Sequence, residues 1–211
     1  MTAAAIKGAE FAGYRSLGTM EFLVDPEGTF YFIEMNTRVQ VEHPVTEMVT
    51  GLDLLKLQIR LAAGEPLPFR QADVAFHGHA IEARILAEDA DRDFAPTFGT
   101  VSDYQPAGGP GVRIDSHLYP GYEPPPFYDS LLAKVIVWGQ DREEALIRLD
   151  RALFEMRITG PKTTIPFLRS VIADGEFRSG QAHTQYTLHK PLPPGPGGTA
   201  PRPPADAPHE K

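Results

Sequence analysis

Apolar side chains recur along the chain with periods that change from one segment to the next, and these changes mark the expected elements. Residues 2–12 are rich in alanine, with apolar side chains at helical spacing, and predict a short helix that ends at Gly13. Residues 16–24 and 29–36 are strand-like runs separated by "DPEG", a sequence typical of a turn. We therefore predict a β-hairpin close to the N-terminus.

Two further helices are expected after the hairpin. Pro44 and Thr46 are typical helix-start residues. Residues 53–63 then place leucine and isoleucine on a broad apolar face, until glycine and proline end the pattern. Residues 67–74, "LPFRQADV", have the composition of a connector. The first domain is therefore expected to span residues 1–75.

The rest of the chain alternates short strand-like runs with glycine and proline. Strands are expected at residues 77–89, 100–105, 111–116 and 131–139, and amphipathic helices at 141–156 and 163–174. Antiparallel strands with helices at one end favour the α+β class. We expect residues 76–190 to form a second domain. Residues 191–211 include eight prolines and few apolar side chains, and predict a disordered tail.

The composition argues against several classes of function. The net charge of −8 argues against a nucleic-acid-binding protein. The absence of cysteine excludes disulfides, thiolate catalysis and cysteine-bound zinc. No apolar run approaches the length of about 20 residues that crosses a membrane, and the first residues lack the pattern of a signal peptide. We expect a cytoplasmic protein without a membrane or nucleic-acid partner.

The second hairpin strand begins apolar and then carries a polar residue at every second position. These polar residues are Glu34, Asn36, Arg38, Gln40 and Glu42. If the strand continues through them, side-chain alternation places all five on one face. Such a row is either a solvated or salt-bridged polar edge, or the lining of a site, and the pattern alone leaves both open.

Pairing the hairpin strands brings two acids of the expected sheet together. An even-numbered loop centred on the turn puts Glu21 opposite Phe32, so that Glu21 and Glu34 share a face as diagonal neighbours. Two carboxylates with the Asn36 amide suit Mg²⁺ or Mn²⁺, which take the rest of their ligands from water and phosphate. This register also places Phe30 and Phe32 on the acidic face, as expected of a nucleotide pocket.

The end of the row suggests an anion site. Arg38 beside Gln40 is a suitable receptor for a small planar anion such as bicarbonate, and Glu42 is placed to take a proton from it. His43 is either a catalytic histidine or a residue that shapes the turn before Pro44, and we expect the second. The glycine-rich "AGGPG" at residues 107–111 lacks a following lysine and helix start, so we expect a plain turn.

The stretch "EMNTRVQVEHPVTE" resembles the biotin carboxylase family, ATP-grasp enzymes that carboxylate protein-bound biotin. The resemblance continues through "GYRSLGTMEF", "GHAIEARILAED", "PPFYDSLLAKVIVWG" and "DREEALIRLDRAL", over roughly residues 3–189. Other ATP-grasp ligases, such as the large subunit of carbamoyl-phosphate synthetase, share "EMN" but differ after it. The resemblance implies that residues 1–75 are part of an ATP-grasp lobe and residues 76–190 a biotin carboxylase C-terminal domain.

The resemblance also implies residue roles. Glu21 and Glu34 match acids that bind ATP through two divalent ions, and Asn36 matches the amide ligand. Arg38, Gln40 and the backbone of Val41 match the bicarbonate site, Glu42 matches the general base, and Arg84 matches the arginine that binds biotin and stabilises its enolate. A local alternative for Arg84 is an ion pair with Glu82, two residues earlier on the same strand face.

The implied reaction is the ATP- and bicarbonate-dependent carboxylation of biotin on a separate carrier protein, through carboxyphosphate. The implied partners are the biotin carboxyl carrier protein, the carboxyltransferase and a second copy of the chain. The resemblance covers about the second half of a biotin carboxylase and leaves out the glycine-rich lid and the phosphate-binding lysines. We expect either the C-terminal part of an enzyme that pairs with its N-terminal half, or a non-catalytic remnant that binds a partner.

Overall fold

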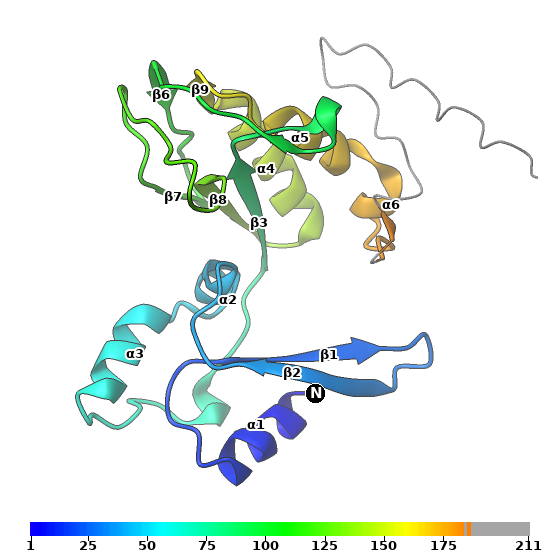
Figure 1. Cartoon of the computed structure of the whole chain (residues 1–211). Helices are drawn as coiled ribbons and strands as arrows, with labels where there is room; N and C mark the ends of the chain where they lie inside the picture. Colours follow the sequence, from blue (N-terminus) through cyan, green and yellow to red (C-terminus); the bar gives the residue numbers. More distant parts are fainter. Residues whose placement is uncertain (184, 187–211) are drawn as a thin grey trace, which may run out of the picture. The chain divides into compact units, whose positions relative to one another are not determined.

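The computed structural model describes residues 1–183, 185 and 186, and the chain divides into two compact units (Figure 1). The first unit is residues 1–78, and the second begins at His79. Helices combine with antiparallel strands, so the α+β class is confirmed. No helix in this described part is long and apolar enough to cross a membrane. The tail predicted for residues 191–211 lies outside the described residues.

The N-terminal unit contains the predicted hairpin and helices (Figure 1). Its elements are α1 (Thr2–Phe11), β1 (Thr19–Val24), β2 (Phe30–Asn36), α2 (His43–Thr50), α3 (Leu54–Ala62) and the 3₁₀ turn η1 (Gln71–Asp73). The Asp53 carboxylate accepts a hydrogen bond from the Lys56 amide at 2.8 Å, and this cap fixes the start of α3. Gly51 ends α2 in the left-handed region, at φ 71°.

The register of the hairpin differs from the prediction. Glu21 lies directly opposite Glu34, whereas Phe22 lies opposite Phe32, so Ile33 is an extra residue in β2 and forms a bulge. The loop between the strands, residues 25–29, has an odd length. The expected pairing of Glu21 with Phe32 is therefore wrong, but the expected shared face of the two acids is correct.

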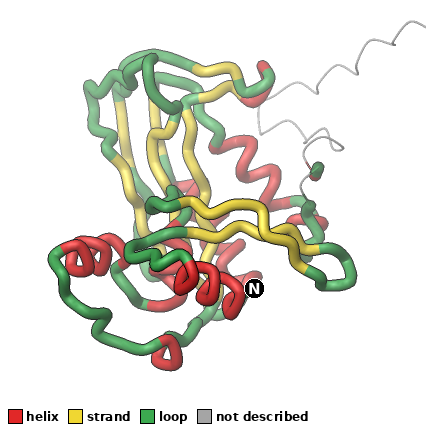
Figure 2. The backbone as a smooth tube through the Cα atoms, turned by 60° about the horizontal axis from the view of Figure 1, so that its bottom comes forward, coloured by secondary structure: helices red, strands yellow, loops and turns green. Residues whose placement is uncertain are grey.

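The C-terminal unit is built on a three-stranded antiparallel sheet in the order β3-β8-β7 (Figures 1 and 2). These strands are His79–Leu86, Leu131–Gly139 and Val112–Ser116. Shorter pairs join β4 (Glu88–Asp89) to β5 (Ala95–Pro96) and β6 (Asp103–Gln105) to β9 (Arg157–Thr159). The helices are α4 (Arg142–Glu155), α5 (Ile165–Ala173), α6 (Gly175–Arg178) and the 3₁₀ turn η2 (Ala90–Arg92).

The core of the C-terminal unit lies between α4 and one face of this sheet (Figure 1). The predicted inward face of α4 is buried, with Leu146 fully covered and Leu149 only 2% exposed. These side chains pack against Ile85 and Val135, which point to the same side of their strands. The other face of the sheet carries polar side chains such as Arg84 and Lys134, together with Ile136, which is fully buried.

Candidate functional site

The two acids of the hairpin converge on one side chain. The Asn36 amide nitrogen donates a hydrogen bond to the Glu21 carboxylate at 2.8 Å and another to the Glu34 carboxylate at 3.1 Å. One oxygen of each acid thus lies within hydrogen-bond distance of a single atom, as the direct cross-strand pairing requires. These three residues lie together as predicted, although the two acids are directly paired and not diagonal neighbours.

This group fits a divalent ion of the Mg²⁺ type. Two convergent carboxylates and one amide are hard oxygen ligands, and Mg²⁺ usually completes its shell with water and phosphate oxygens. The Asn36 oxygen accepts from the Arg38 guanidinium at 3.5 Å, so the amide must rotate before this oxygen can bind a metal. The described residues include no group of three or more His, Cys, Asp or Glu side chains that could hold an ion, so the acid pair would need Asn36 and ligands from outside these residues.

The phenylalanines of the hairpin strands lie on the opposite face from the acids. Phe22 pairs with Phe32, and successive residues of β1 alternate, so both rings are on the side away from Glu21. Phe22 forms edge-to-face contacts with Phe30 and Phe32, at centroid distances of 5.5 and 6.0 Å. The prediction that Phe30 and Phe32 share the acidic face is therefore wrong, because the Ile33 bulge shifts the alternation.

The polar row beyond Asn36 is a loop instead of a strand. β2 ends at Asn36, and Glu42 is already the N-cap residue of α2. Arg38 and Glu42 are exposed, and Gln40 folds back so that its side-chain nitrogen donates to the Glu21 carboxylate at 3.2 Å. The oxygen of the same amide, Oε1, is buried and has no hydrogen-bond partner in the part of the chain that the structure describes. The loop therefore keeps Gln40 beside the acid pair without a continuous strand.

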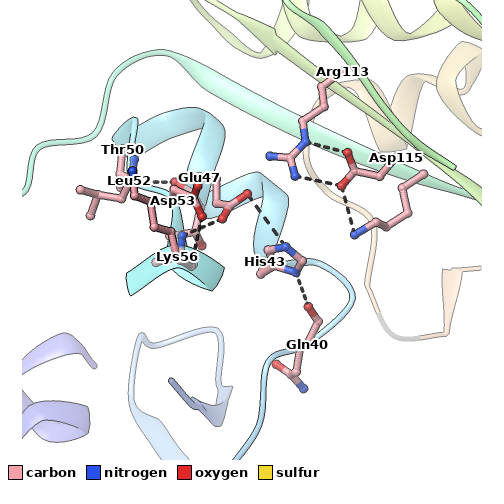
Figure 3. Close-up of polar contacts among 12 residues, drawn as sticks. Gln40, His43, Glu47, Thr50, Leu52, Asp53, Lys56, Arg113 and Asp115 are labelled. Carbon is pink, nitrogen blue, oxygen red and sulfur yellow. Dashed lines mark hydrogen bonds and ion pairs between the residues drawn. The ribbon is translucent and has the colours of Figure 1, made fainter. Parts of the chain in front are cut away.

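His43 holds this loop, as the turn-shaping prediction requires. Its ring nitrogen Nδ1 lies 2.7 Å from the Gln40 carbonyl oxygen (Figure 3). Its other nitrogen, Nε2, lies 3.9 Å from the Glu47 carboxylate, one helical turn later. Glu47 in turn accepts a hydrogen bond from the Leu54 amide at 2.7 Å, at the start of α3.

Arg84 lies in the C-terminal unit on the sheet face away from α4. It is directly opposite Lys134, which is directly opposite Asp115, so the three form one row across β3, β8 and β7. Arg84 is 50% exposed, and its Nε lies 3.9 Å from the Glu82 carboxylate. The local ion-pair alternative is therefore present, and it leaves the guanidinium accessible to a ligand.

Asp115 is the anionic partner in this row. Its two oxygens accept from the Arg113 guanidinium at 2.8 and 2.9 Å, and Lys134 Nζ lies 3.5 Å away (Figure 3). Burial alone would raise the pKa of the Asp115 carboxyl, but the hydrogen bonds and charges of Arg113 and Lys134 outweigh it and lower this pKa below the ordinary value.

Three residues near these groups were not predicted from the sequence: Glu47, Asp115 and Lys134. A signal for Glu47 was available, because it stands four residues after His43 and such pairs meet on one helix face. Asp115 and Lys134 give no such signal, because their contact depends on the pairing of β7 with β8, strands separated by a long connection.

Two family models match the chain. The biotin carboxylase C-terminal domain matches residues 82–188, just over half of the chain. The ATP-binding domain of the carbamoyl-phosphate synthase L chain matches residues 1–70. The second model includes the acid pair, Asn36 and the loop to Glu42, whereas the first includes Arg84.

Individual proteins give the same result. A pyruvate carboxylase subunit of Methanothermobacter thermautotrophicus is 55% identical, over 88% of this chain and 38% of the length of that protein. A biotin carboxylase of Nostoc is 56% identical, over 88% of this chain and 42% of the length of that protein. The biotin carboxylase domain of Hydrogenobacter thermophilus 2-oxoglutarate carboxylase, solved as a dimer with MgADP, ADP and bicarbonate, superimposes with a TM-score of 0.86 at 51% identity, over 87% of this chain and 41% of that one. The chain thus spans about two fifths of the length of these relatives.

Proposed function

The chain belongs to the biotin carboxylase family, and on that premise we propose that it supplies the metal, bicarbonate and biotin residues of an ATP-dependent ligase. The reaction is the carboxylation of biotin on a carrier protein, with bicarbonate as the carbon source and carboxyphosphate as the intermediate. Residues 1–75 act as part of the ATP-grasp lobe and residues 76–190 as the C-terminal domain. The partners are the carrier protein, the carboxyltransferase, the remainder of an ATP-grasp lobe and a second copy of the chain.

Glu21, Glu34 and Asn36 are proposed to hold two divalent ions at the ATP phosphates. The ions would be Mg²⁺ or Mn²⁺, and they would neutralise phosphate charge. The convergence of the two carboxylates on the Asn36 amide supports this role, since the oxygens already face one point. The MgADP bound to the Hydrogenobacter domain supports Mg²⁺ in particular.

Arg38, Gln40 and the Val41 backbone are proposed to bind bicarbonate, with Glu42 as the base that takes its proton. The exposed Arg38 guanidinium provides charge and paired donors for a planar anion. Gln40 has an amide oxygen without a partner among the described residues, and a rotation of this amide would bring the oxygen to a bicarbonate hydroxyl. Glu42 is exposed, as a carboxylate that must reach a substrate proton should be.

Arg84 is proposed to bind biotin. Its half-exposed guanidinium stands beside Lys134 on a sheet face that also carries Glu82 and Asp115, and its exposed donors are suited to an electron-rich ring oxygen. The observation that carries the whole proposal is the direct pairing of Glu21 with Glu34 on a strand that runs straight into the Arg38–Glu42 loop. This one segment holds both the metal acids and the anion-binding residues.

The proposal is tested by separating its two half-reactions. The chain would be combined with the part of the Nostoc biotin carboxylase that lies outside the matched region, and phosphate release and carboxybiotin formation would be measured. Arg84→Ala should lower biotin carboxylation by about a hundredfold while bicarbonate-dependent ATP hydrolysis stays within about threefold. Arg157→Ala, which changes an exposed arginine of the same unit, is the control and should leave both unchanged.

Equal loss of both activities in a folded Arg84→Ala protein would mean that the roles are wrongly divided. An assembled wild-type complex that binds its partner but hydrolyses no ATP in the presence of bicarbonate would favour the non-catalytic alternative.

A further inference from the structure

Two groups of His43 converge on one carbonyl oxygen. Its backbone N–H donates to the Gln40 oxygen at 3.2 Å, and its ring Nδ1 lies 2.7 Å from the same oxygen. A carbonyl oxygen can only accept, so Nδ1 must carry a proton. This fixes the tautomer of the neutral ring, with the proton on Nδ1 and a lone pair on Nε2.

The other ring nitrogen of His43 faces Glu47. The His43 and Glu47 side chains are 12% and 9% exposed, and 3.9 Å separates Nε2 from the carboxylate (Figure 3). This distance is too long for a direct hydrogen bond, and an ion pair forms here only when the ring is protonated. The other Glu47 oxygen accepts from the Leu54 amide, which ties Glu47 to the start of α3.

The contact between His43 and the Gln40 carbonyl also affects the Val41 N–H, because both groups belong to one peptide unit. A trans peptide is planar, and its C=O and N–H point in opposite directions. When His43 fixes the Gln40 carbonyl, it also fixes the direction of the Val41 N–H on the far side of the same plane. Two donors on one oxygen leave that plane little freedom to rotate.

We infer that His43 is a positioning residue that aims the Val41 N–H at the bound anion. This inference rests on the proposed function, which assigns the Val41 backbone to bicarbonate. His43 itself does not touch substrate in this scheme, and it acts only through the Gln40–Val41 peptide. Its removal should therefore impair bicarbonate binding more than ATP binding.

The first test is the tautomer of His43 in the 211-residue chain. Long-range ¹H–¹⁵N spectra of the imidazoles, recorded at a pH where the ring is neutral, should show the proton of His43 on Nδ1. His117, which contacts the Tyr122 ring, serves as the comparison within the same protein. A neutral His43 ring with its proton on Nε2 would overturn the inference, because Nδ1 could then not donate to Gln40.

The second test is kinetic and uses the chain combined with the Nostoc segment. His43→Leu should raise KM for bicarbonate about tenfold, with KM for ATP within about twofold. His43→Asn, whose amide can donate in place of Nδ1, should recover most of the loss, and His117→Leu should behave as wild type. An unchanged bicarbonate KM in His43→Leu, or equal rises in both KM values without rescue by Asn, would assign His43 to folding alone and overturn the inference.

The two proposals fail in different ways. A wild-type complex without bicarbonate-dependent ATP hydrolysis would overturn the proposed function, and this inference with it. An active wild-type complex in which His43→Leu keeps its bicarbonate KM would overturn the inference and leave the function standing.

Discussion

At the residue scale, the acid pair of the hairpin is the feature most open to direct measurement. Glu34→Gln keeps the size of the side chain and removes half of the paired negative charge facing Asn36. We expect the 211-residue chain to bind Mn²⁺ weakly, because phosphate oxygens are not there to complete the shell, and Glu34→Gln to weaken it at least tenfold. Water proton relaxation during a Mn²⁺ titration measures this binding.

Glu27→Gln is the matched control for this titration, because Glu27 is an exposed acid in the turn of the same hairpin. It makes the same change of net charge away from the pair. Equal Mn²⁺ affinities for wild type and Glu34→Gln would contradict the metal assignment, and equal losses in both variants would mean that only the overall charge attracts the ion.

A second prediction at this scale concerns acid stability and Asp115. The pKa of its carboxyl is lowered in the folded protein, so its contribution to stability is complete above the ordinary aspartate pKa of about 4 and is lost as the pH falls through the lower folded value. Asp115→Asn should lower the free energy of unfolding by about 1 kcal/mol at pH 7. The expected loss is small because Asp115 is partly exposed and solvent weakens its ion pairs. Denaturant unfolding at pH 7 and pH 2.5 should show this difference shrinking toward zero in acid.

Asp103→Asn provides the comparison, since its contact with Arg157 is a 3.8 Å pair between side chains that are mostly exposed. We expect almost no change in stability from that substitution at either pH. A pH-independent loss in Asp115→Asn would show that shape or packing, and not the charge, is what Asp115 contributes.

At the element scale, helix α4 has both buried and exposed apolar side chains, so the two kinds of position can be compared within one helix. Leu146 is fully buried against the sheet, whereas the next residue, Ile147, is 59% exposed. Leu146→Ala should lower the free energy of unfolding by about 3 kcal/mol, and Ile147→Ala by less than about 0.5 kcal/mol. Urea unfolding monitored by circular dichroism measures both, and equal losses would contradict the orientation of α4.

The sequence predicts the long elements well because their signals are local. The helix expected at residues 141–156 is observed at Arg142–Glu155, and the strand expected at residues 131–139 is observed with the same bounds. The short strands β4, β5 and β9 and the single turn α6 were not predicted as separate elements. Two- or three-residue strands have too few alternating positions to form a pattern, and their existence depends on a partner strand.

The hairpin register was wrong for a physical reason that can be traced to its residues. The residues from Phe30 to Ile33 are all apolar, so they do not alternate with polar residues and neither face of the strand is favoured. The register of such a strand is weakly specified. A bulge could therefore enter at Ile33, because all four of these apolar residues are exposed and neither face is fixed by a core. The shared face of Glu21 and Glu34 was nevertheless predictable, whereas the fold-back of Gln40 onto Glu21 depends on a loop that alternation cannot describe.

At the scale of the whole molecule, the two units differ sharply in burial. Within residues 1–78, all of which the structure describes, Pro44 is the only buried residue. The second unit has two clusters of buried apolar side chains. A two-stranded hairpin without a packed face is marginally stable in water. The unit that carries the metal and bicarbonate residues is therefore the one that most needs additional protein around it.

This contrast leads to an expectation for activity. A polypeptide of these 211 residues, which spans about two fifths of the length of its relatives, should show no measurable biotin carboxylase turnover. Transfer of a phosphoryl group to bicarbonate needs the phosphates held in line and their charge neutralised. Glu21 and Glu34 with their ions would supply part of that neutralisation, and the lysines and glycine-rich lid implied by the resemblance have no counterpart in the sequence.

The size of the expected loss follows from the number of contacts. Each phosphate contact that is lost costs a few kcal/mol in the transition state, so several together lower the rate by many powers of ten. The assay is ATP- and bicarbonate-dependent phosphate release with free biotin, and addition of the separately expressed Nostoc segment should restore activity if the two parts dock. Robust turnover by the purified 211-residue polypeptide, abolished by Glu42→Gln, would mean that residues 1–75 assemble a complete phosphate site by themselves.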